Sequence, residues 1–345
     1  MSQLRFRWIA AAMIVGLVLL TAVSAYRYRW ELRVIRSRLE ATHLWDLRAG
    51  VFAPDRKVEI RRNRKLRLAA REYEPPGDPR ATVLLLHGHT PKGSDLAFYR
   101  VLGRRLAAAG YRVLAPDFAG FGDSDDPFSI PYEDGFSGDY DVEAWLSLLE
   151  SEPGDVDTPL FIVAHSAGVS SGMTVGLQDD LVSGIVAIGP SRRVIEDLAN
   201  PVRVEYWWRR NQRTHRQVYG TNFPAWYTKE IWLSEALDEG TTAGLKRPME
   251  SFLPLLQVEG HHPVLLIDGE REPEVDRIYL RAYFGEMAEP KDYHTLAGSD
   301  HYSNAAHLGK WAIYDRKVVD ETVSVLDEWM TGIIEAPQHA PSLDP

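Results

Sequence analysis

From residue 81 onward, short runs of consecutive apolar residues alternate with amphipathic stretches. A short, continuous apolar run predicts a strand buried on both faces, and apolar positions at helical spacing predict a helix. Strands that alternate with helices are typical of an α/β fold with a mostly parallel sheet covered on both faces. The predicted strands are 81–87, 111–117, 159–165, 182–189, 262–269 and 291–298, and the predicted helices are 95–110, 138–151, 166–177, 274–285 and 305–333.

Three further segments follow other patterns. Residues 57–62 and 66–73 alternate apolar and polar side chains, which predicts half-exposed antiparallel strands. Residues 190–260 interrupt the strand–helix alternation and contain four tryptophans among several arginines. We expect this interruption to form a helical cap at the carboxyl edge of the sheet, where ligands bind in open parallel sheets.

The chain therefore divides into an N-terminal appendage and one large domain. About 300 residues follow the first apolar segment, which is enough for a single well-buried core. The predicted segments are an N-terminal membrane anchor at 1–30, a helical connector at 31–55, the first part of the core at 56–189, the helical cap at 190–260, the second part of the core at 261–333 and a disordered tail at 334–345.

The uncharged segment at residues 8–26 predicts a membrane anchor. At about 1.5 Å per residue, this segment would form a helix roughly 28 Å long, close to the hydrocarbon thickness of a bilayer. Arg27 and Arg29 follow at once, which favours a retained single-pass anchor; a signal peptide cleaved near Ser24 is the alternative. More arginines follow the segment than precede it, which predicts a main domain on the cytoplasmic side, with a periplasmic or extracellular position as the alternative.

Charge is distributed unevenly along the chain. Residues 1–71 contain 16 lysines and arginines against 5 acidic residues, whereas residues 72–345 contain 23 against 44. The basic N-terminal part suits an anionic membrane surface, and the acidic remainder argues against nucleic acid as a partner. The lack of cysteine excludes disulfides, thiolate metal sites and a cysteine nucleophile, and no metal or cofactor is expected.

Ser166 stands where a predicted strand passes directly into a predicted helix. A nucleophile on such a sharp turn is lifted clear of the sheet, and the small residues Ala164 and Gly168 relieve crowding around it. The helix N-terminus offers N–H groups and a positive dipole end to a developing oxyanion. Residues 168–172 match G-x-S-x-G literally, but Ser170 would lie one turn inside the helix, so Ser166 is the predicted nucleophile.

Two backbone amides are candidates for an oxyanion hole. His87, Gly88 and His89 come at the end of the first buried strand. The amide of His89, together with that of Ala167 after the nucleophile, would hold the oxyanion. The side chain of His87 is expected to be satisfied by hydrogen bonds within the turn. For His89, the alternative to a backbone role in the oxyanion hole is a side chain that faces the substrate.

A carboxylate and a histidine follow the nucleophile in loops after late strands. Glu272 lies three residues after Gly269 and just before a proline, where a carboxylate can orient a histidine ring. Asp268 and Asp276 remain alternatives for this acid. His301 follows the last predicted strand, in a loop that can reach back over the sheet, and is the predicted base.

The chain resembles the α/β-hydrolase superfamily through the stretches LLLHGH (84–89), PDFAGFGDSD (116–125), VAHSAG (163–168), LLIDGEREP (265–273) and LAGSDH (296–301). The second stretch is similar to a segment of lysophospholipase, monoacylglycerol lipase and serine aminopeptidase-like members. The resemblance implies an α/β-hydrolase fold and hydrolysis through an acyl-enzyme, and Ser166 disfavours dehalogenases and epoxide hydrolases, which use a carboxylate there. Ala164 and Glu272 depart from the usual pattern, and the substrate is not identified by the fold.

These residues predict a membrane-anchored serine hydrolase that cleaves the carboxylic esters of lipid-like or amphiphilic compounds. A serine peptidase or amidase that uses the same Ser-His-acid triad is one alternative. The other alternative is a catalytically silent binding protein, although such a protein would be expected to have lost Ser166, His301 or Glu272. The expected partners are a small-molecule ester and a membrane, without nucleic acid or metal.

Overall fold

The computed structural model describes residues 2–62, 65–127, 138–152, 158–190 and 254–336, with short pieces between residues 204 and 230. Most of the cap predicted at 190–260 and most of the tail predicted at 334–345 lie outside the described residues, so both remain predictions. The last helix, α11 (Arg316–Glu335), continues two residues beyond the predicted end of the core.

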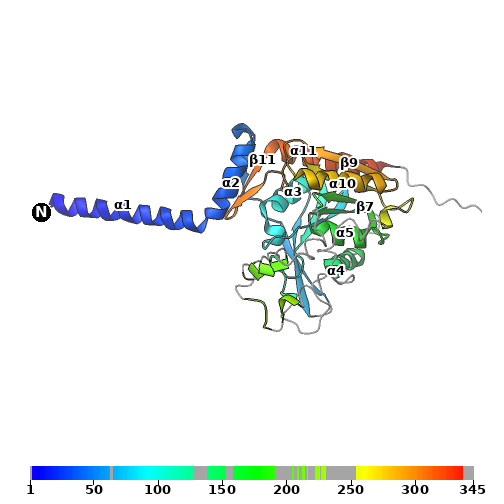
Figure 1. The fold of residues 1–345 in the computed structure, drawn as a ribbon, viewed down its shortest axis with the longest axis horizontal. Coiled ribbons are helices and arrows are strands. Elements are labelled where there is room, and N and C mark those ends of the chain that lie inside the picture. Colours follow the sequence, from blue (N-terminus) through cyan, green and yellow to red (C-terminus); the bar gives the residue numbers. More distant parts are fainter. Residues whose placement is uncertain are drawn as a thin grey trace, which may run out of the picture.

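Within the described residues, the central sheet has eight strands: β2 (Arg56–Arg62), β3 (Leu66–Tyr73), β4 (Ala81–Leu86), β5 (Tyr111–Pro116), β6 (Leu160–His165), β7 (Val182–Ile188), β8 (Val264–Gly269) and β9 (Lys291–Leu296). Across the sheet they follow the order β2-β3-β5-β4-β6-β7-β8-β9. Figure 1 shows this sheet within the domain and labels β7 and β9. β3 runs antiparallel to β2 and β5, and all neighbours from β5 to β9 are parallel. The prediction of a mostly parallel sheet that begins with an antiparallel pair is confirmed.

Helices cover both faces of this sheet, and each face has its own core. Successive side chains of a strand point to opposite faces, so the continuous apolar run of β4 contributes to both cores. Leu84 and Leu86 pack on one face, where each fully buried leucine contributes about 1.5–3 kcal/mol, and Val83 and Leu85 pack on the other. The first core includes α4 (Gly138–Ser151), α5 (Gly168–Gly176) and α10 (Glu274–Glu286), and the second includes α3 (Ala97–Ala108), which follows η2 (Gly93–Asp95), and α11.

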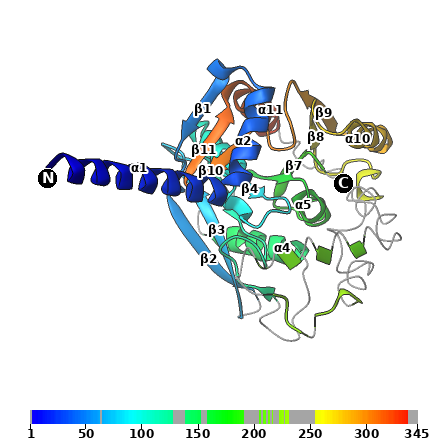
Figure 2. The ribbon, with the colours of Figure 1, turned by 60° about the vertical axis from the view of Figure 1, so that its left-hand side comes forward.

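A second, small antiparallel sheet lies beside the main one, formed by β1 (Leu47–Gly50), β11 (Trp311–Asp315) and β10 (Ala306–Leu308) in that order (Figure 2). The prediction of continuous helix over 305–333 is wrong here, because β10 and β11 form a hairpin. α11 begins only after Asp315, whose carboxylate accepts hydrogen bonds from the N–H groups of Lys317 and Val318. The predicted connector at 31–55 is helical only in its first part, since β1 pairs with β11 from the far end of the chain.

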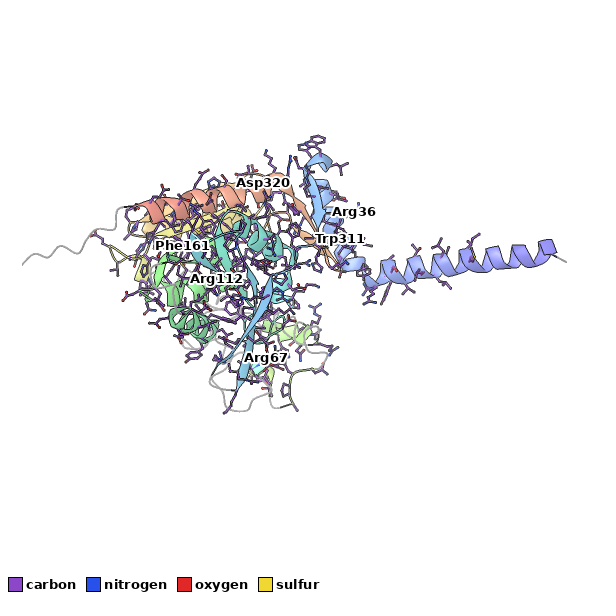
Figure 3. The ribbon with its side chains drawn as sticks, turned by 180° about the vertical axis from the view of Figure 1, so that it is seen from behind. Arg36, Arg67, Arg112, Phe161, Trp311 and Asp320 are labelled. Carbon is purple, nitrogen blue, oxygen red and sulfur yellow. The ribbon has the colours of Figure 1, made fainter. Side chains whose placement is uncertain are left out.

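Two helices precede the domain: α1 (Ser2–Arg27) and α2 (Arg29–Ala41), followed by the short η1 (Leu44–Asp46). α1 projects away from the domain, and α2 turns back to lie beside β10 (Figures 1 and 3). As far as their residues are described, none of the helices is both long and apolar enough to cross a membrane. The helix predicted over 8–26 is present, but the single-pass membrane anchor at 1–30 is not supported. An apolar run in a sequence predicts a helix, but it does not establish that a membrane surrounds this helix.

Candidate active site

Ser166 lies in a strained turn between β6 and α5. Its backbone φ of 54° is in the left-handed region, which costs a non-glycine residue about 1–3 kcal/mol and persists only where the surrounding structure imposes it. β6 ends at His165 and α5 begins at Gly168, so the chain turns sharply at the serine. The N–H of Ser166 donates to the carbonyl of Ile188 at 3.0 Å, which ties the turn to the end of β7.

Small residues allow the close packing around this turn. A Cβ atom on Gly168 would come 2.6 Å from the carbonyl oxygen of His87, and Ala164 is fully buried in the strand below α5. Ser170, which belongs to the literal G-x-S-x-G match, lies inside α5 and exposes none of its surface. Its hydroxyl therefore has no access to a substrate.

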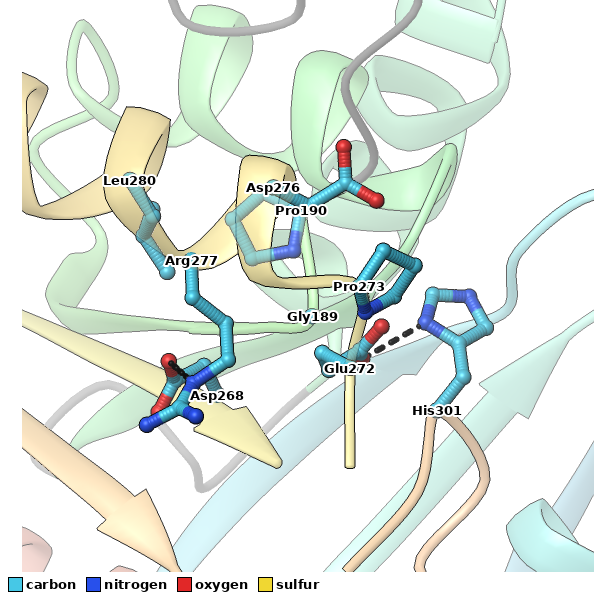
Figure 4. A pocket seen from close by; sticks show the side chains of 9 residues that line it. All are labelled: Gly189, Pro190, Asp268, Glu272, Pro273, Asp276, Arg277, Leu280 and His301. Atoms are coloured by element: carbon cyan, nitrogen blue, oxygen red, sulfur yellow. Dashed lines mark hydrogen bonds and ion pairs between the residues drawn. The ribbon is translucent and has the colours of Figure 1, made fainter. Parts of the chain in front are cut away.

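His301 and Glu272 are joined by a hydrogen bond of 2.8 Å between Nδ1 and Oε1 (Figure 4). They lie in the loops after β9 and β8, at the same carboxyl edge of the sheet as Ser166. Gly189, at the end of β7, leaves the space for this pair: its φ is 52°, and a Cβ atom there would come 2.8 Å from Glu272 Oε1. Because Nδ1 donates to the carboxylate, Nε2 is the nitrogen that remains for proton exchange.

The two alternative acids have other surroundings. Oδ2 of Asp268 accepts hydrogen bonds from Nε of Arg277 at 3.0 Å and from the hydroxyl of Tyr293 at 2.7 Å. Asp276 lies in the first turn of α10, at the wall of a cavity. The hydrogen bond to the histidine is made by Glu272, and Asp268 is held away by its own partners.

The loop after β4 runs beside Ser166. A Cβ atom on Gly88 would come 2.7 Å from the Cβ atom of Ser166, so this approach requires glycine. His89 follows in the same loop, with its ring edge-on to that of Phe121 at 5.2 Å between ring centres. Ala167 is the N-cap residue of α5. The two amides predicted for the oxyanion hole thus belong to the two segments that border the serine.

His87 stabilises this loop. It is buried, its Nδ1 donates to the carbonyl of Gly88 at 2.7 Å, and its Nε2 accepts the N–H of Phe118 at 3.0 Å. A ring that donates through one nitrogen and accepts through the other is neutral. Burial lowers the pKa of His87 and keeps it neutral, in agreement with the expectation of a satisfied turn histidine.

Tyr99 and His165 are polar groups of the site that the sequence patterns did not single out. The hydroxyl of Tyr99 accepts the N–H of Gly88 at 2.7 Å and lies 2.7 Å from Nδ1 of His165. Nε2 of His165 lies 2.6 Å from the carbonyl oxygen of His301. The position of His165 directly before Ser166 was the one available clue, since Tyr99 reaches the site only through the fold.

A cavity of about 260 Å³ opens next to His301 and Glu272 (Figure 4). Its walls combine the apolar residues Pro190, Pro273 and Leu280 with the charged residues Asp276 and Arg277. This lining suits a ligand that has both apolar and polar parts. In the parts of the chain that the structure describes, no three His, Asp or Glu side chains gather closely enough to hold a metal ion.

Comparison with known families matches one model, described as the alpha/beta hydrolase family, to residues 83–310. This range includes the loops that carry Gly88, Ser166, Glu272 and His301.

Individual relatives match over a short stretch or at low identity. A haloalkane dehalogenase from Mycobacterium marinum is 56% identical over 48 residues, a match that covers 14% of this chain and 15% of that protein. A solved serine hydrolase homologue from Coxiella burnetii has a TM-score of 0.51 at 15% identity, covering 81% of this chain and 100% of that one. Est1E from Butyrivibrio proteoclasticus, solved with ferulic acid bound, has a TM-score of 0.52 at 16% identity, covering 80% and 99%. At these identities the structural likeness extends to the fold alone.

Proposed function

Because the chain belongs to the alpha/beta hydrolase family, we propose that it is a serine hydrolase that cleaves carboxylic esters through an acyl-enzyme. Ser166 is the nucleophile, His301 the general base and Glu272 the acid that orients the base. One observation carries this proposal: a serine in the left-handed region sits at a strand-to-helix turn, on the same sheet edge as a histidine whose Nδ1 is bound to a carboxylate. Strain of this kind is retained where it serves a function.

In the proposed reaction, Oγ of Ser166 attacks the ester carbonyl while Nε2 of His301 takes its proton. The hydrogen bond from Nδ1 to Glu272 stabilises the imidazolium, and the amides of His89 and Ala167 hold the oxyanion of the tetrahedral adduct. When the adduct collapses, the alcohol leaves with the proton from His301, and the acyl group stays on Ser166 as an ester. A water molecule activated by His301 then attacks this ester and releases the carboxylic acid.

Dehalogenation does not suit a serine at this position. An alkyl group transferred from carbon–halogen cleavage to Ser166 would form an ether, which has no carbonyl for water to attack. The short match with a haloalkane dehalogenase therefore does not carry that activity over to this chain.

The proposed substrate is an amphiphilic or lipid-like ester. A cavity of about 260 Å³ beside His301 and Glu272 supports this proposal, since it offers room for part of such a molecule next to the proposed base. Its apolar wall of Pro190, Pro273 and Leu280 suits an aliphatic or aromatic part, while Asp276 and Arg277 suit a polar part.

A substrate panel tests the proposal. Purified protein is offered p-nitrophenyl acetate, butyrate and octanoate together with the matching p-nitroanilides. We expect ester turnover, with a loss of at least about a thousandfold in kcat for Ser166→Ala and no more than about twofold for the buried control Ser170→Ala. Faster cleavage of the anilides would indicate an amidase or peptidase. No turnover of either series by the folded protein would indicate a binding protein.

A further inference from the structure

A buried chain of hydrogen bonds runs behind the nucleophile through Tyr99 and His165. Tyr99 lies in the first turn of α3, His165 ends β6, and neither exposes any surface. The chain begins at the N–H of Gly88, passes through the Tyr99 hydroxyl and the His165 ring, and ends at the carbonyl oxygen of His301. It therefore joins the loop after β4, the residue before Ser166 and the backbone of the histidine.

The partners determine where each proton lies. The carbonyl oxygen of His301 only accepts, so Nε2 of His165 carries a proton. The Tyr99 oxygen already accepts the N–H of Gly88, so its own proton points to Nδ1 of His165. Burial lowers the pKa of His165 well below its usual range and raises the pKa of Tyr99 well above its own, so neither group is charged near neutral pH.

The neutral state of His165 matters because its ring lies only 4.6 Å from the ring of His301, centre to centre. A positive charge at that distance would oppose the imidazolium that forms on His301 during proton transfer. The ring is also closely confined, since a Cβ atom on Gly88 would come 3.2 Å from Nδ1 of His165.

The loop that carries His301 needs such a restraint. Two non-glycine residues next to it, Ser303 and Asn304, have left-handed φ values of 47° and 55°. Conformations of this kind persist only when neighbouring groups impose them. The hydrogen bond from His165 is made to the main chain of the loop itself, at the residue whose side chain faces Glu272.

We propose that Tyr99 and His165 are positioning residues, which hold the oxyanion loop and the His301 loop at fixed distances from Ser166. This inference rests on the proposed hydrolase activity. Catalytic groups must be held within about 0.5 Å of their working positions, and neutral buried hydrogen bonds to the backbone provide that constraint without touching the substrate.

The first test compares Tyr99→Phe with Tyr73→Phe. Both tyrosines are fully buried, but in the described part of the chain the hydroxyl of Tyr73 has no hydrogen-bond partner. We expect Tyr99→Phe to lower kcat about 10–100-fold, as loss of an outer-shell partner does, with KM changed by less than about threefold. Tyr73→Phe is expected to leave both constants within about twofold. Equal effects of the two substitutions would overturn the proposal.

The second test replaces the ring. Gln at position 165 can still donate to the carbonyl of His301, whereas Leu cannot, so His165→Gln is expected to retain more kcat than His165→Leu. The Leu variant also leaves the Tyr99 hydroxyl and the His301 carbonyl without this partner, so it is expected to unfold at a lower denaturant concentration. Measuring kcat per folded molecule separates a loss of rate from this loss of stability. Rates that simply follow the unfolding midpoints would assign His165 a structural role only.

Nitrogen-15 NMR of the unmodified protein tests the protonation state without any assay of activity. His165 is expected to show a protonated Nε2, an unprotonated Nδ1 and no titration between pH 5.5 and 9. Titration near the ordinary histidine pKa of about 6.5 would contradict the inference.

A fluorophosphonate probe separates this inference from the proposed function. If the unmodified protein is not labelled at Ser166, the proposed function fails. If it is labelled, and Tyr99→Phe is labelled at the same rate, only the inference on Tyr99 and His165 fails.

Discussion

Two polar clusters, each partly buried, lie at the carboxyl edge of the main sheet, and they are built in opposite ways. The first, called here the Asp117 cluster, is held together by bonds to the carboxylate of Asp117 and consists of Arg71, Ser94, Asp117 and Asp123. The second, called here the His301 cluster, is held together by hydrogen bonds of two histidine rings and consists of Tyr99, His165, Glu272 and His301.

In the Asp117 cluster every carboxylate oxygen of Asp117 is used. Oδ1 accepts from the N–H and the hydroxyl of Ser94 at 2.6 and 2.7 Å, and Oδ2 accepts from Arg71 and from the N–H of Asp123, both at 2.8 Å. Such a cluster fixes the turn after β5, but it leaves Asp117 no atom for a substrate.

In the His301 cluster, by contrast, one ring nitrogen of His301 is not bonded to the carboxylate of Glu272. His165 ends β6 directly before a strained serine. His301 lies in the loop after β9, at the wall of a cavity, with its Nε2 not engaged by the carboxylate. A buried carboxylate whose oxygens are all hydrogen-bonded, such as that of Asp117, holds the structure together. A histidine with one ring nitrogen bonded to a carboxylate and the other not, next to a serine with a strained backbone, is instead suited to proton transfer.

The largest expected effect concerns Glu272, the proposed acid of the His301 cluster. Glu272→Gln is expected to lower kcat by about a thousandfold or more, because an amide cannot stabilise the imidazolium as a carboxylate does. Glu270→Gln is the matched control from the same loop, because Glu270 is exposed and its carboxylate accepts the N–H of Gly298, away from His301. Ester turnover by each purified variant is the measurement. Loss of activity in Asp276→Asn with retention in Glu272→Gln would move the acid to Asp276.

The second prediction concerns the Asp117 cluster. Arg71→Met leaves the buried carboxylate of Asp117 without its cation, and we expect the free energy of unfolding to fall by about 3–5 kcal/mol. Lys57→Met, which removes an exposed partner of Asp123, is expected to cost less than about 1 kcal/mol.

Urea unfolding measures these losses, and kcat per folded molecule is expected to change less than about twofold in either variant. A selective loss of kcat in Arg71→Met, with stability unchanged, would remove the distinction between the two clusters.

The third prediction tests a link between the His301 cluster and the N-terminal part of the chain, which lies outside the matched family range. Arg38 of α2 forms an ion pair with Asp300, whose carboxylate also accepts the N–H groups of Tyr302 and Asn304 at 2.9 Å. Because this carboxylate shapes the loop of His301, the proposed base, Arg38→Gln is expected to lower kcat/KM by about tenfold or less, on the order of 1 kcal/mol.

The control for this third prediction is Arg36→Gln. Arg36 is exposed and pairs with Glu40 one turn along the same helix (Figure 3). If both substitutions leave kcat/KM unchanged, α2 does not support the site.

The fourth and smallest effect is a difference in pH dependence. The depressed pKa values of His87 and His165 mean that the unfolded chain binds protons below pH 6.5 that the folded protein does not. Their contribution to stability is therefore complete above about pH 6.5 and is lost as pH falls below it. For Asp123, burial is outweighed by Lys57 and Arg71, which lower its pKa, so its contribution is lost only below about pH 4.

Urea unfolding between pH 7.5 and 4.5 measures this dependence. His165→Gln is expected to show a shallower decline than the unmodified protein between pH 6.5 and 5. Parallel declines would mean that His165 titrates normally.

Local patterns sufficed for most of the sheet and for the strand-to-helix turn at Ser166. β4 and β6 are continuous apolar runs because both of their faces are buried, and their ends were predicted to within two residues. The hairpin of β10 and β11 was missed, although Gly309 and Lys310 form a short link between strands, because the apolar positions around it also fit a helix. β1 could not be predicted, since β11, the strand with which it pairs, lies at the other end of the chain.

The residues of the candidate site likewise divide into those that the sequence predicted and those that it did not. Ser166, Glu272 and His301 were predicted from their order after successive strands, which sequence shows directly. Tyr99 and the ion pair of Arg38 depend on contacts between distant segments, for which a single sequence has no signal.

The most direct test of the central claim is the site of covalent labelling. The protein is treated with a fluorophosphonate probe and digested, and the modified residue is identified by mass spectrometry. We predict a single adduct on Ser166, formed at one equivalent per chain and absent after heat denaturation. An adduct on Ser170, or no adduct on the folded protein while it cleaves esters, would contradict the assignment of Ser166 as the nucleophile.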